Sequence, residues 1–504
     1  MILHHLRPAI AALSFLAISL SLNAEVTLAP MFSDGAVLQQ GRKVPIWGTA
    51  DSGERITVQF SNQNLDTYAD ANGNWRVDLA PLSINAESAE LVIIGTTTLR
   101  VKDVLVGEVW LCSGQSNMER TFRELHIAPP SEPEINDPLL RHFTLRNTAS
   151  QFPQTTVMGT WASTSVSNAA TLSAVAYFFG RDLRDQLNVP VGLINASWGG
   201  TQIESWMSPS AIINTSFSDA IAERWAKILV DYPAAIKTYK LRLRMWEAEK
   251  AASSATGQSF TRARPFKPFG EHHQARPSSI YNGMIHPLIP ASISGVIGYQ
   301  GESYTRRTKE YRQPFPAMIK QWRQDFDQPN MPFYFVQLAN LDRGTPLRQW
   351  AYLREAQTTA LDLAFTGMAV AIDIGESDDI HPKNKHDVGR RLALLALAEV
   401  YKKEVHPYGP RFDHIELVDQ SLRIHYARSE KLVARANALS SFEIAGADQI
   451  FLPAQARIEG TTVLVSSPEV PSPTAVRYAF NNNSSVNLYN EYGLPAEPFR
   501  SDSW

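Results

Sequence analysis

The sequence predicts a mixed α/β fold with a β-rich region on each side, and the residue patterns of three successive stretches support this prediction. Residues 25–105 contain short apolar runs separated by turn signals such as ADSGE and ADANGNW, a pattern typical of a small β-sandwich. Residues 106–405 alternate apolar strands with helical periodicity, which indicates a parallel sheet covered by helices on both faces. Residues 406–504 return to strand texture, so we expect a second β-rich region that packs with the first.

A long, charged, helix-prone stretch interrupts the α/β region at about residues 217–278. We interpret it as an insertion that packs a helical hairpin or lid on the core. The basic face of its helix is expected to be solvated surface, with a binding patch as the alternative.

The length and composition of the chain limit the number of domains and the classes of function that it can have. With 504 residues, two or three domains are expected, and 44% hydrophobic with 19% charged residues is the profile of a well-packed globular protein. The net charge is −3 and no long basic run occurs, so the electrostatic footprint of a nucleic-acid-binding protein is missing. We therefore expect neutral substrates rather than polyanions, although a local patch can still be charged.

The first 24 residues predict export. Arg7 precedes an apolar run at residues 9–22, and small or polar residues end at Ala24, which is the pattern of a signal peptide spanning residues 1–24. No later stretch is long and apolar enough to span a bilayer, so we expect no membrane attachment after cleavage. The single cysteine, Cys112, permits no intrachain disulfide, which favours a bacterial periplasmic or secreted protein. Because it lies in the apolar run VWLC, Cys112 is expected to be buried and inert.

A serine follows an apolar strand in the run GEVWLCSGQSNME, residues 107–119. A serine at the carboxyl end of a parallel strand lies where α/β folds bind their ligands. If Ser116 begins a helix, its backbone N–H can help to stabilise an oxyanion; the alternative is that Ser116 only caps the helix. The amides of Gln115 and Asn117 favour the first interpretation.

Two further strand ends carry polar or flexible residues. INASWGGTQIESW ends a strand at Gly199 and Gly200, where a substrate carbonyl can approach backbone N–H groups, although Gly-Gly pairs most often mark turns. IGYQGESYT supplies the amide of Gln300 and the carboxylate of Glu302.

The last block, AIDIGESDDIHPKNKHDVG, contains an acid and a base in one loop. A serine nucleophile needs a base and an acceptor that orients it, and Asp378 with His381 can supply both. The neighbouring Asp379 is a competing orienter with different spacing. An alternative is a metal-dependent deacetylase with His381 and His386 among its ligands, but no compact set of metal ligands is visible in the sequence.

Taken together, these blocks resemble the SGNH hydrolases, specifically the sialate O-acetylesterase-like carbohydrate esterases. The resemblance rests on GQSNME, ASWGGTQIESW, YNGMIHPL, YQGES and DIHPKNK, and on SDGAVLQQ, FEIAGADQIFLPA and GLPAEPFRSD near the two ends. It covers nearly the whole mature chain. It implies a flavodoxin-like three-layer α/β/α domain, β-sandwich accessory parts, and removal of acetyl esters from sugars without a metal or other cofactor.

The resemblance also implies roles for individual residues. It makes Ser116 the nucleophile, His381 the general base and Asp378 its orienter. The oxyanion would be bound by the Ser116 amide, by the amide of Gly199 or Gly200, and by the Gln300 side chain. The family usually has Asn directly after Gly-Glu-Ser, whereas this chain has Tyr304 at that position, so a sugar contact at 304 is in doubt.

Other residues of these motifs have mainly structural interpretations. His286 is expected to be structural or to line the wall of the site, and Glu302 to brace a neighbouring group rather than act as an acid. Trp198 and Trp206 can stack on sugar rings, but core packing explains them equally well.

The sequence thus predicts an exported carbohydrate O-acetylesterase that acts on acetylated saccharides derived from plant hemicellulose such as xylan or xyloglucan. A sialate O-acetylesterase is the first alternative. A metal-dependent deacetylase and a non-catalytic sugar-binding protein are more distant ones.

Overall fold

The computed structural model describes residues 25–342 and 348–504, so the predicted signal peptide, residues 1–24, lies outside the described residues. Within those two ranges no helix is long and apolar enough to cross a membrane.

Short antiparallel strands form the N-terminal region. Strand β3 (Arg55–Phe60) pairs with β4 (Gln63–Tyr68) and β6 (Asn85–Ile94), while β2 (Val44–Thr49) pairs with β5 (Asn74–Leu79). In β5, the buried residues Trp75, Val77 and Leu79 alternate with exposed ones, so one face of the strand points into the core.

The longest strand, β7 (Thr98–Gly114), belongs to both the N-terminal region and the α/β region. Its first half pairs with β6 and with β1 (Val37–Gln39). From Glu108 onward it pairs with β10 (Val191–Ser197) on one side, and from Trp110 with β11 (Gly295–Tyr299) on the other. The predicted boundary at residues 105–106 therefore falls inside one continuous strand, and both regions share its backbone.

The central sheet has the strand order β13-β12-β11-β7-β10-β8-β9. Its remaining strands are β8 (Asp137–Leu145), β9 (Gly159–Thr164), β12 (Phe333–Gln337) and β13 (Thr366–Val370). All pairs along this order are parallel except β8 with β9, which is antiparallel at the edge. The carboxyl ends of β7, β10 and β11 therefore meet at one edge of the sheet, where ligands bind in such folds.

Helices pack against both faces of this sheet. On β12, Phe333 and Phe335 contact Phe315 of α6 (Pro314–Asp325), while Tyr334 points to the other face and stacks on Trp110. That second face carries α2 (Ala174–Leu187) and α8 (Lys385–Glu399), which pack against each other. The remaining helices of the body are α1 (Ser116–Glu119), α3 (Pro209–Ile213), α5 (Thr308–Tyr311) and α7 (Gln349–Thr358). Short 3₁₀ helices also occur: η1 (Ala169–Thr171), η2 (Ile203–Trp206), η4 (His286–Leu288), η5 (Glu302–Arg307) and η6 (Thr359–Asp362), while η3 (Tyr281–Ile285) is a π-helix.

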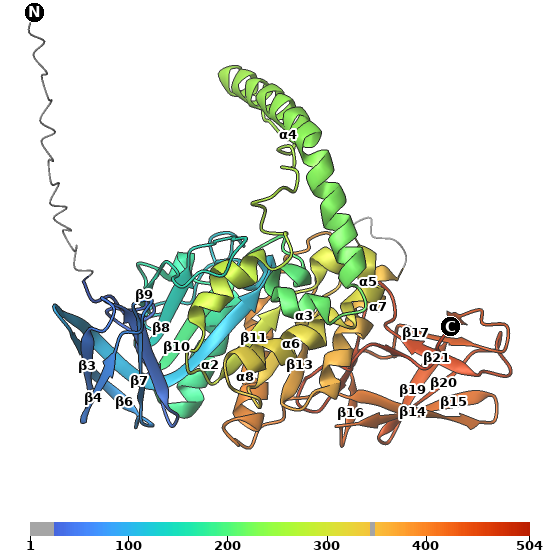
Figure 1. Cartoon of the computed structure of the whole chain (residues 1–504). Coiled ribbons are helices and arrows are strands. Elements are labelled where there is room, and N and C mark those ends of the chain that lie inside the picture. The colour runs from blue at the N-terminus through green and yellow to red at the C-terminus, as the bar shows by residue number, and fades with distance from the viewer. Residues whose placement is uncertain (1–24, 343–347) are drawn as a thin grey trace, which may run out of the picture.

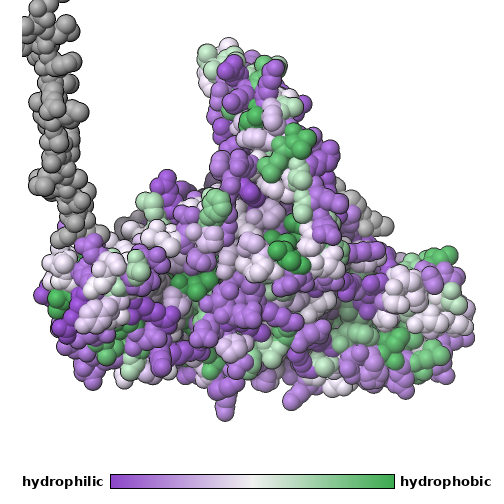
Figure 2. Space-filling model, in the orientation of Figure 1, coloured by the Kyte–Doolittle hydropathy of each residue, from purple (hydrophilic) through white to green (hydrophobic). Residues whose placement is uncertain are grey.

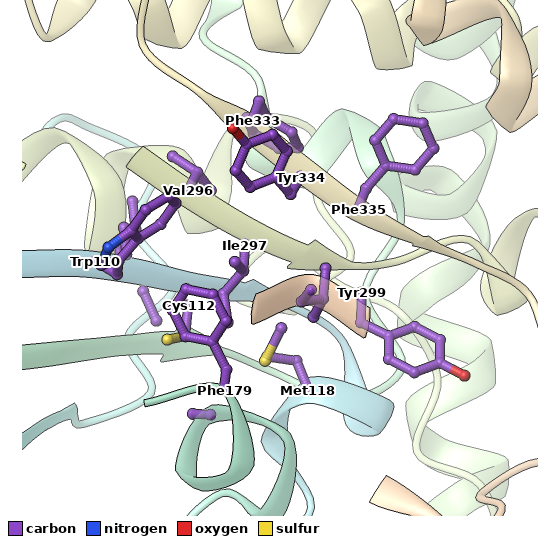
Figure 3. Close-up of a cluster of buried hydrophobic side chains, with 14 of the residues drawn as sticks. Trp110, Cys112, Met118, Phe179, Val296, Ile297, Tyr299, Phe333, Tyr334 and Phe335 are labelled. Atoms are coloured by element: carbon purple, nitrogen blue, oxygen red, sulfur yellow. The ribbon is translucent and has the colours of Figure 1, made fainter. Parts of the chain in front are cut away.

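Aromatic side chains fill the core between β7, its neighbours and α2 (Figure 3). The ring of Trp110 lies 5.2 Å from that of Phe179 and 5.9 Å from that of Tyr334, measured between centroids. Trp110 is fully buried, so its removal is expected to cost about 3–5 kcal/mol of unfolding free energy. This cluster fixes the strand that carries the serine.

The C-terminal region consists of small antiparallel sheets. One contains β14 (Arg411–Val418), β15 (Ser421–Ala427), β20 (Thr462–Ser466) and β19 (Gln455–Glu459). A second contains β18 (Leu452–Pro453), β17 (Phe442–Ala445), β21 (Ala475–Tyr478) and β23 (Phe499–Arg500), and β16 (Leu432–Ala434) pairs with β22 (Leu488–Asn490).

The expectation that the two β-rich regions pack together is wrong, because they lie at opposite ends of the α/β region (Figure 1). The N-terminal region is fixed by its shared strand β7. The C-terminal region is fixed near β12 and β13 instead, where the buried Arg354 guanidinium donates to the carbonyls of Asn481 (2.9 Å) and Asn482 (2.8 Å). Tyr489 adds a hydrogen bond from its hydroxyl to Asp373 (3.2 Å).

The insertion at residues 217–278 is also built differently from the expected helical hairpin. One 38-residue helix, α4 (Ser218–Ala255), projects from the body, and a return segment without helix follows it (Figure 1). Ile221, close to its base, is the buried residue of this helix. Most of the projecting surface is hydrophilic, with isolated apolar patches (Figure 2). We call residues 218–270 the arm.

Candidate active site

The end of β7 places Ser116 at the edge of the sheet. Gly114 has a φ of +137°, and a Cβ there would lie 2.1 Å from the carbonyl oxygen of Tyr299, so only glycine fits this close approach. The next residue, Gln115, donates its backbone N–H to the same carbonyl (2.9 Å). Ser116 then begins α1, and its side chain projects into a surface cleft.

His381 lies against this serine. Its Nε2 is 2.8 Å from Ser116 Oγ, which is hydrogen-bonding distance for a proton transfer. Burial, together with the nearby positive charges of Arg120 and Lys385, lowers the pKa of His381 to about 4. The imidazole is therefore neutral at pH 7 and can accept the serine proton.

The carboxylate closest to the other ring nitrogen differs from the expected one. Asp379 Oδ1 lies 3.7 Å from His381 Nδ1, which is too long for a hydrogen bond, and accepts the backbone N–H of His381 (2.9 Å). An aspartate readily accepts the N–H two residues ahead of it, and this local turn brings Asp379 beside the ring. Asp378, the predicted orienter, is exposed and makes no hydrogen bond or ion pair to the described residues. In this conformation the sequence expectation for position 378 is not met.

A buried polar network connects the residues that follow Ser116 with those beside His381. The side-chain amide of Asn117 donates to Glu302 Oε1 (2.5 Å) and to the carbonyl of Ile380 (2.9 Å), the residue before His381. Its oxygen accepts from Lys385 Nζ (2.5 Å). Asn117 thus ties the nucleophile helix, the histidine loop and α8 together.

Both charged members of this network are shifted in pKa. Burial lowers the pKa of Lys385 to about 7, while the nearby Glu302 carboxylate acts to raise it. Burial also raises the pKa of Glu302, against the hydrogen bond from Asn117. Glu302 accepts a hydrogen bond from Asn117, and its role as a brace stays a prediction.

Ser116, Gly199 and Gly200 line the same cleft, and their backbone N–H groups are the candidates for binding an oxyanion. The Ser116 N–H has no hydrogen-bond partner among residues 25–342 and 348–504. A Cβ on Gly199 would lie 3.1 Å from Ser116 Cβ, so this backbone passes directly over the serine. The Gly199 N–H donates to Glu119 Oε2 (2.6 Å), whereas the Gly200 N–H donates to no group in the described part of the chain.

Gln300 occupies a different position from the one expected of an oxyanion donor. Its Oε1 accepts the Tyr311 hydroxyl (2.6 Å), and its Nε2 makes only a long contact to the Thr201 carbonyl (3.4 Å). It lines a small internal cavity of about 20 Å³ with Ser113 and Trp206 rather than the cleft that exposes Ser116.

The cleft itself has a volume of about 460 Å³. Sequence reasoning missed five of its lining residues, namely Glu119, Arg120, Glu124, Ser303 and Ile380. Glu119 and Arg120 follow Ser116 by three and four positions, the spacing that places side chains on one helix face, and this spacing could have identified them.

Comparison with known proteins identifies the family of this chain. The family described as carbohydrate esterase, sialic acid-specific acetylesterase, matches residues 106–238 and 269–398, more than half of the chain. The chain belongs to this family. The prediction of the family from the sequence motifs is therefore confirmed, and the protein is an esterase.

Relatives extend the match to nearly the whole chain. The sialate O-acetylesterase of Rattus norvegicus is 28% identical and that of Mus musculus 29% identical, each with 90% of this chain and 90% of the relative covered. The crystal structure of a carbohydrate acetylesterase from Xanthomonas citri is 35% identical, with a TM-score of 0.80, and covers 95% of this chain and 100% of its own.

Several family-motif residues of this esterase lie outside the cleft. Trp206 is buried and donates from Nε1 to Thr201 Oγ1 (3.0 Å), and Trp198 packs partly buried against the core. His286 Nδ1 lies 2.9 Å from the Gln154 carbonyl oxygen. Tyr304 is buried, with the Arg307 guanidinium 4.1 Å above its ring. Each of these residues packs or braces the structure.

No three His, Cys, Asp or Glu side chains gather into a metal-holding group in the parts of this esterase that the structure describes. Of the residues considered as ligands, His381 faces Ser116 and His386 packs edge-on against the ring of Phe178. Cys112 is buried, and burial raises the pKa of its thiol.

Proposed function

We propose that this esterase removes O-acetyl groups from saccharides through an acetyl-enzyme formed on Ser116, within a three-layer SGNH-type domain. The observation that carries the proposal is the 2.8 Å contact between Ser116 Oγ and His381 Nε2 in an open cleft. A neutral imidazole at that distance is a general base for the serine hydroxyl.

The reaction proceeds in two halves. Ser116 Oγ attacks the acetyl carbonyl while His381 takes its proton; the tetrahedral intermediate then collapses, and the sugar hydroxyl leaves with that proton. Water attacks the acetyl-enzyme, again losing a proton to His381. The second intermediate releases acetate and returns the proton to Ser116.

The developing oxyanion would be bound by backbone amides. The Ser116 N–H is unpartnered among the described residues and lies at the N-terminus of α1, and the N–H of Gly200 is likewise available. Gly199 would contribute once Glu119 released its N–H. Gln300 is left out of this set because its amide is held by Tyr311 and Thr201.

The carboxylate that orients His381 would come from the loop at residues 378–379. Asp379 is the candidate in the conformation described here, because its carboxylate lies beside His381 Nδ1. Asp378 would need a change in the loop to reach that nitrogen.

The charges of the cleft favour a neutral sugar around the reacting acetate. Glu119, Glu124 and Glu302 line the cleft together with one cation, Arg120. A carboxylate close to the acetyl group would be repelled more than attracted. We therefore propose acetylated hemicellulose-type saccharides as substrates of an exported bacterial enzyme. A sialate ester is the second candidate, which the family description and the names of the mammalian relatives favour.

Acetate release from acetylated xylan, acetylated xyloglucan oligosaccharides and O-acetylated sialic acid tests both candidates. Wild type is expected to release acetate from the neutral saccharides with the highest kcat/KM. Preference for the sialate would reverse the substrate assignment, and no release from any of the esters would contradict the function.

A further inference from the structure

The outer part of the arm carries an unusual concentration of positive charge. Residues 236–267 contain eight lysines and arginines but only two acidic residues, a net charge of +6 in a chain whose total is −3. All eight basic side chains are exposed: Lys237, Lys240, Arg242, Arg244, Lys250, Arg262, Arg264 and Lys267. The rest of the chain is therefore acidic overall, and this projecting element carries a local excess of positive charge.

This part of the arm also contains a groove. A cavity of about 600 Å³ lies between α4 and the return segment and is lined by Tyr239, Arg242, Arg262 and Phe266, among others. Phe266 is 75% exposed, so its ring is open to a ligand in the groove. Aromatic side chains beside guanidinium groups are the combination that recognises a sugar ring with a carboxylate substituent.

The two arginines of the groove differ in their partners. Arg262 is held in place by an ion pair with Glu249 (2.5 Å), and its backbone carbonyl accepts the indole N–H of Trp246 (2.8 Å). Arg242 has no acidic partner among the residues that the structure describes, so its guanidinium is available to an anionic ligand.

The base of the arm is tied to the cleft by ion pairs. Arg224 of α4 contacts Glu204 Oε1 (3.2 Å), and Arg307 of η5 contacts the same oxygen (3.2 Å). Glu204 lies a few residues after Gly199 and Gly200, and η5 begins at Glu302. Gly199, Gly200 and Glu302 line the cleft. The arm is therefore fixed to the loops around Ser116.

The distance between groove and cleft sets the size of a shared ligand. The groove begins at Ala235, 17 residues beyond the first residue of α4. At 1.5 Å per residue this is about 25 Å along the helix. A single sugar cannot reach both sites, but an extended polysaccharide can. Association of two arms through the same surface is disfavoured because both carry the same charge.

We propose that the arm groove binds uronate residues of the polysaccharide whose neutral, acetylated residues are deacetylated at Ser116. This inference rests on the proposed function, and it divides the substrate between two sites of opposite charge. The groove lies mostly in residues 239–268, between the two stretches that match the family, so it is a property of this chain rather than of the matched family region.

The test compares two double variants that remove the same charge. Arg242→Gln with Arg262→Gln changes the groove, and Lys402→Gln with Lys403→Gln changes two exposed lysines outside the arm and the cleft. Each is assayed on acetylated glucuronoxylan, on the same polymer after reduction of its carboxylates, and on para-nitrophenyl acetate.

Wild type and the lysine variant are expected to show a KM about tenfold lower for the uronate polymer than for the reduced one, since charge-assisted hydrogen bonds are lost on reduction. The arginine variant is expected to lose this difference while keeping its turnover of para-nitrophenyl acetate. An unchanged KM difference in the arginine variant, or an equal loss in the lysine variant, would overturn the inference. Absence of hydrolysis of every ester by wild type would instead contradict the proposed function.

Discussion

The two ring nitrogens of His381 face regions that are fixed to different degrees. On the Nε2 side, Ser116 follows the buried second part of β7, and the Asn117 network holds its helix to the histidine loop. On the Nδ1 side, Asp379 is nearly half exposed and lies 3.7 Å away in an irregular loop. Packing therefore determines the nucleophile and base, whereas local turn geometry determines which aspartate stands behind the base.

This difference predicts how the site responds to change. Where many buried contacts hold a group, its removal has a large and specific effect, and its neighbours keep their places. Where one local hydrogen bond holds a group, substrate binding can replace that bond.

The largest effect is expected for Ser116→Ala. Because the acetyl-enzyme cannot form, kcat should fall by roughly 10⁴–10⁶-fold while the fold is retained. Ser303→Ala is the matched control, since Ser303 lines the same cleft, and should stay within about threefold of wild type. Turnover by Ser116→Ala close to wild type would contradict the serine mechanism.

The second effect concerns the aspartate pair. Asp379→Asn should lower kcat by roughly 10²–10⁴-fold, because the neutral amide no longer stabilises the imidazolium, and Asp378→Asn should have little effect. The kcat values of both variants, measured on one acetylated oligosaccharide, show which aspartate orients His381. If Asp378→Asn is the more damaging change, the loop rearranges when substrate binds and the spacing in the sequence identifies the functional carboxylate.

Much of the fold and part of the site could be predicted from the sequence. Strand ends such as that before Ser116 are visible as apolar runs followed by small polar residues, and the family motifs placed His381 opposite the serine. The partner of Gln300 could not be predicted, because Tyr311 reaches it only through tertiary packing. The exposed arm and the separation of the two β-rich regions depend on contacts between distant elements, which local patterns do not encode.

A third effect tests the buried network. Lys385→Met removes the donor to Asn117 and loosens the link between the nucleophile helix and Ile380, so kcat should fall by about 10–100-fold. The rate at which a phosphonylating reagent modifies Ser116 should fall by a similar factor. If Lys385 only stabilised the fold, that rate would not need to change in the folded enzyme. Lys383→Met, an exposed neighbour, is the control. An unchanged modification rate would separate Lys385 from the positioning of the serine.

Gln300→Ala is expected to act on stability rather than on turnover. It leaves the buried Tyr311 hydroxyl without its side-chain acceptor, which should lower the free energy of unfolding by about 1–3 kcal/mol. The kcat of the folded enzyme should stay within about threefold of wild type. A loss of 10²–10³-fold in kcat with normal stability would return Gln300 to the oxyanion hole.

The smallest effect concerns the pH dependence set by His381. Protonated His381 cannot accept the serine proton, so kcat/KM should fall as the pH drops through the pKa of this histidine, about 4. The positive charge of Arg120 helps to keep that pKa low. Arg120→Gln should therefore raise the pKa of His381 and move the acidic limb of the pH–rate profile upward by about half a pH unit, the size expected for one partly exposed charge pair.

The control is Arg123→Gln, which removes the same charge from an exposed position that does not line the cleft and should leave the acidic limb in place. Equal shifts in both variants would mean that the net charge of the surface sets the limb. A shift in Arg120→Gln alone would show that this cation acts directly on His381, in addition to the larger effect of burial.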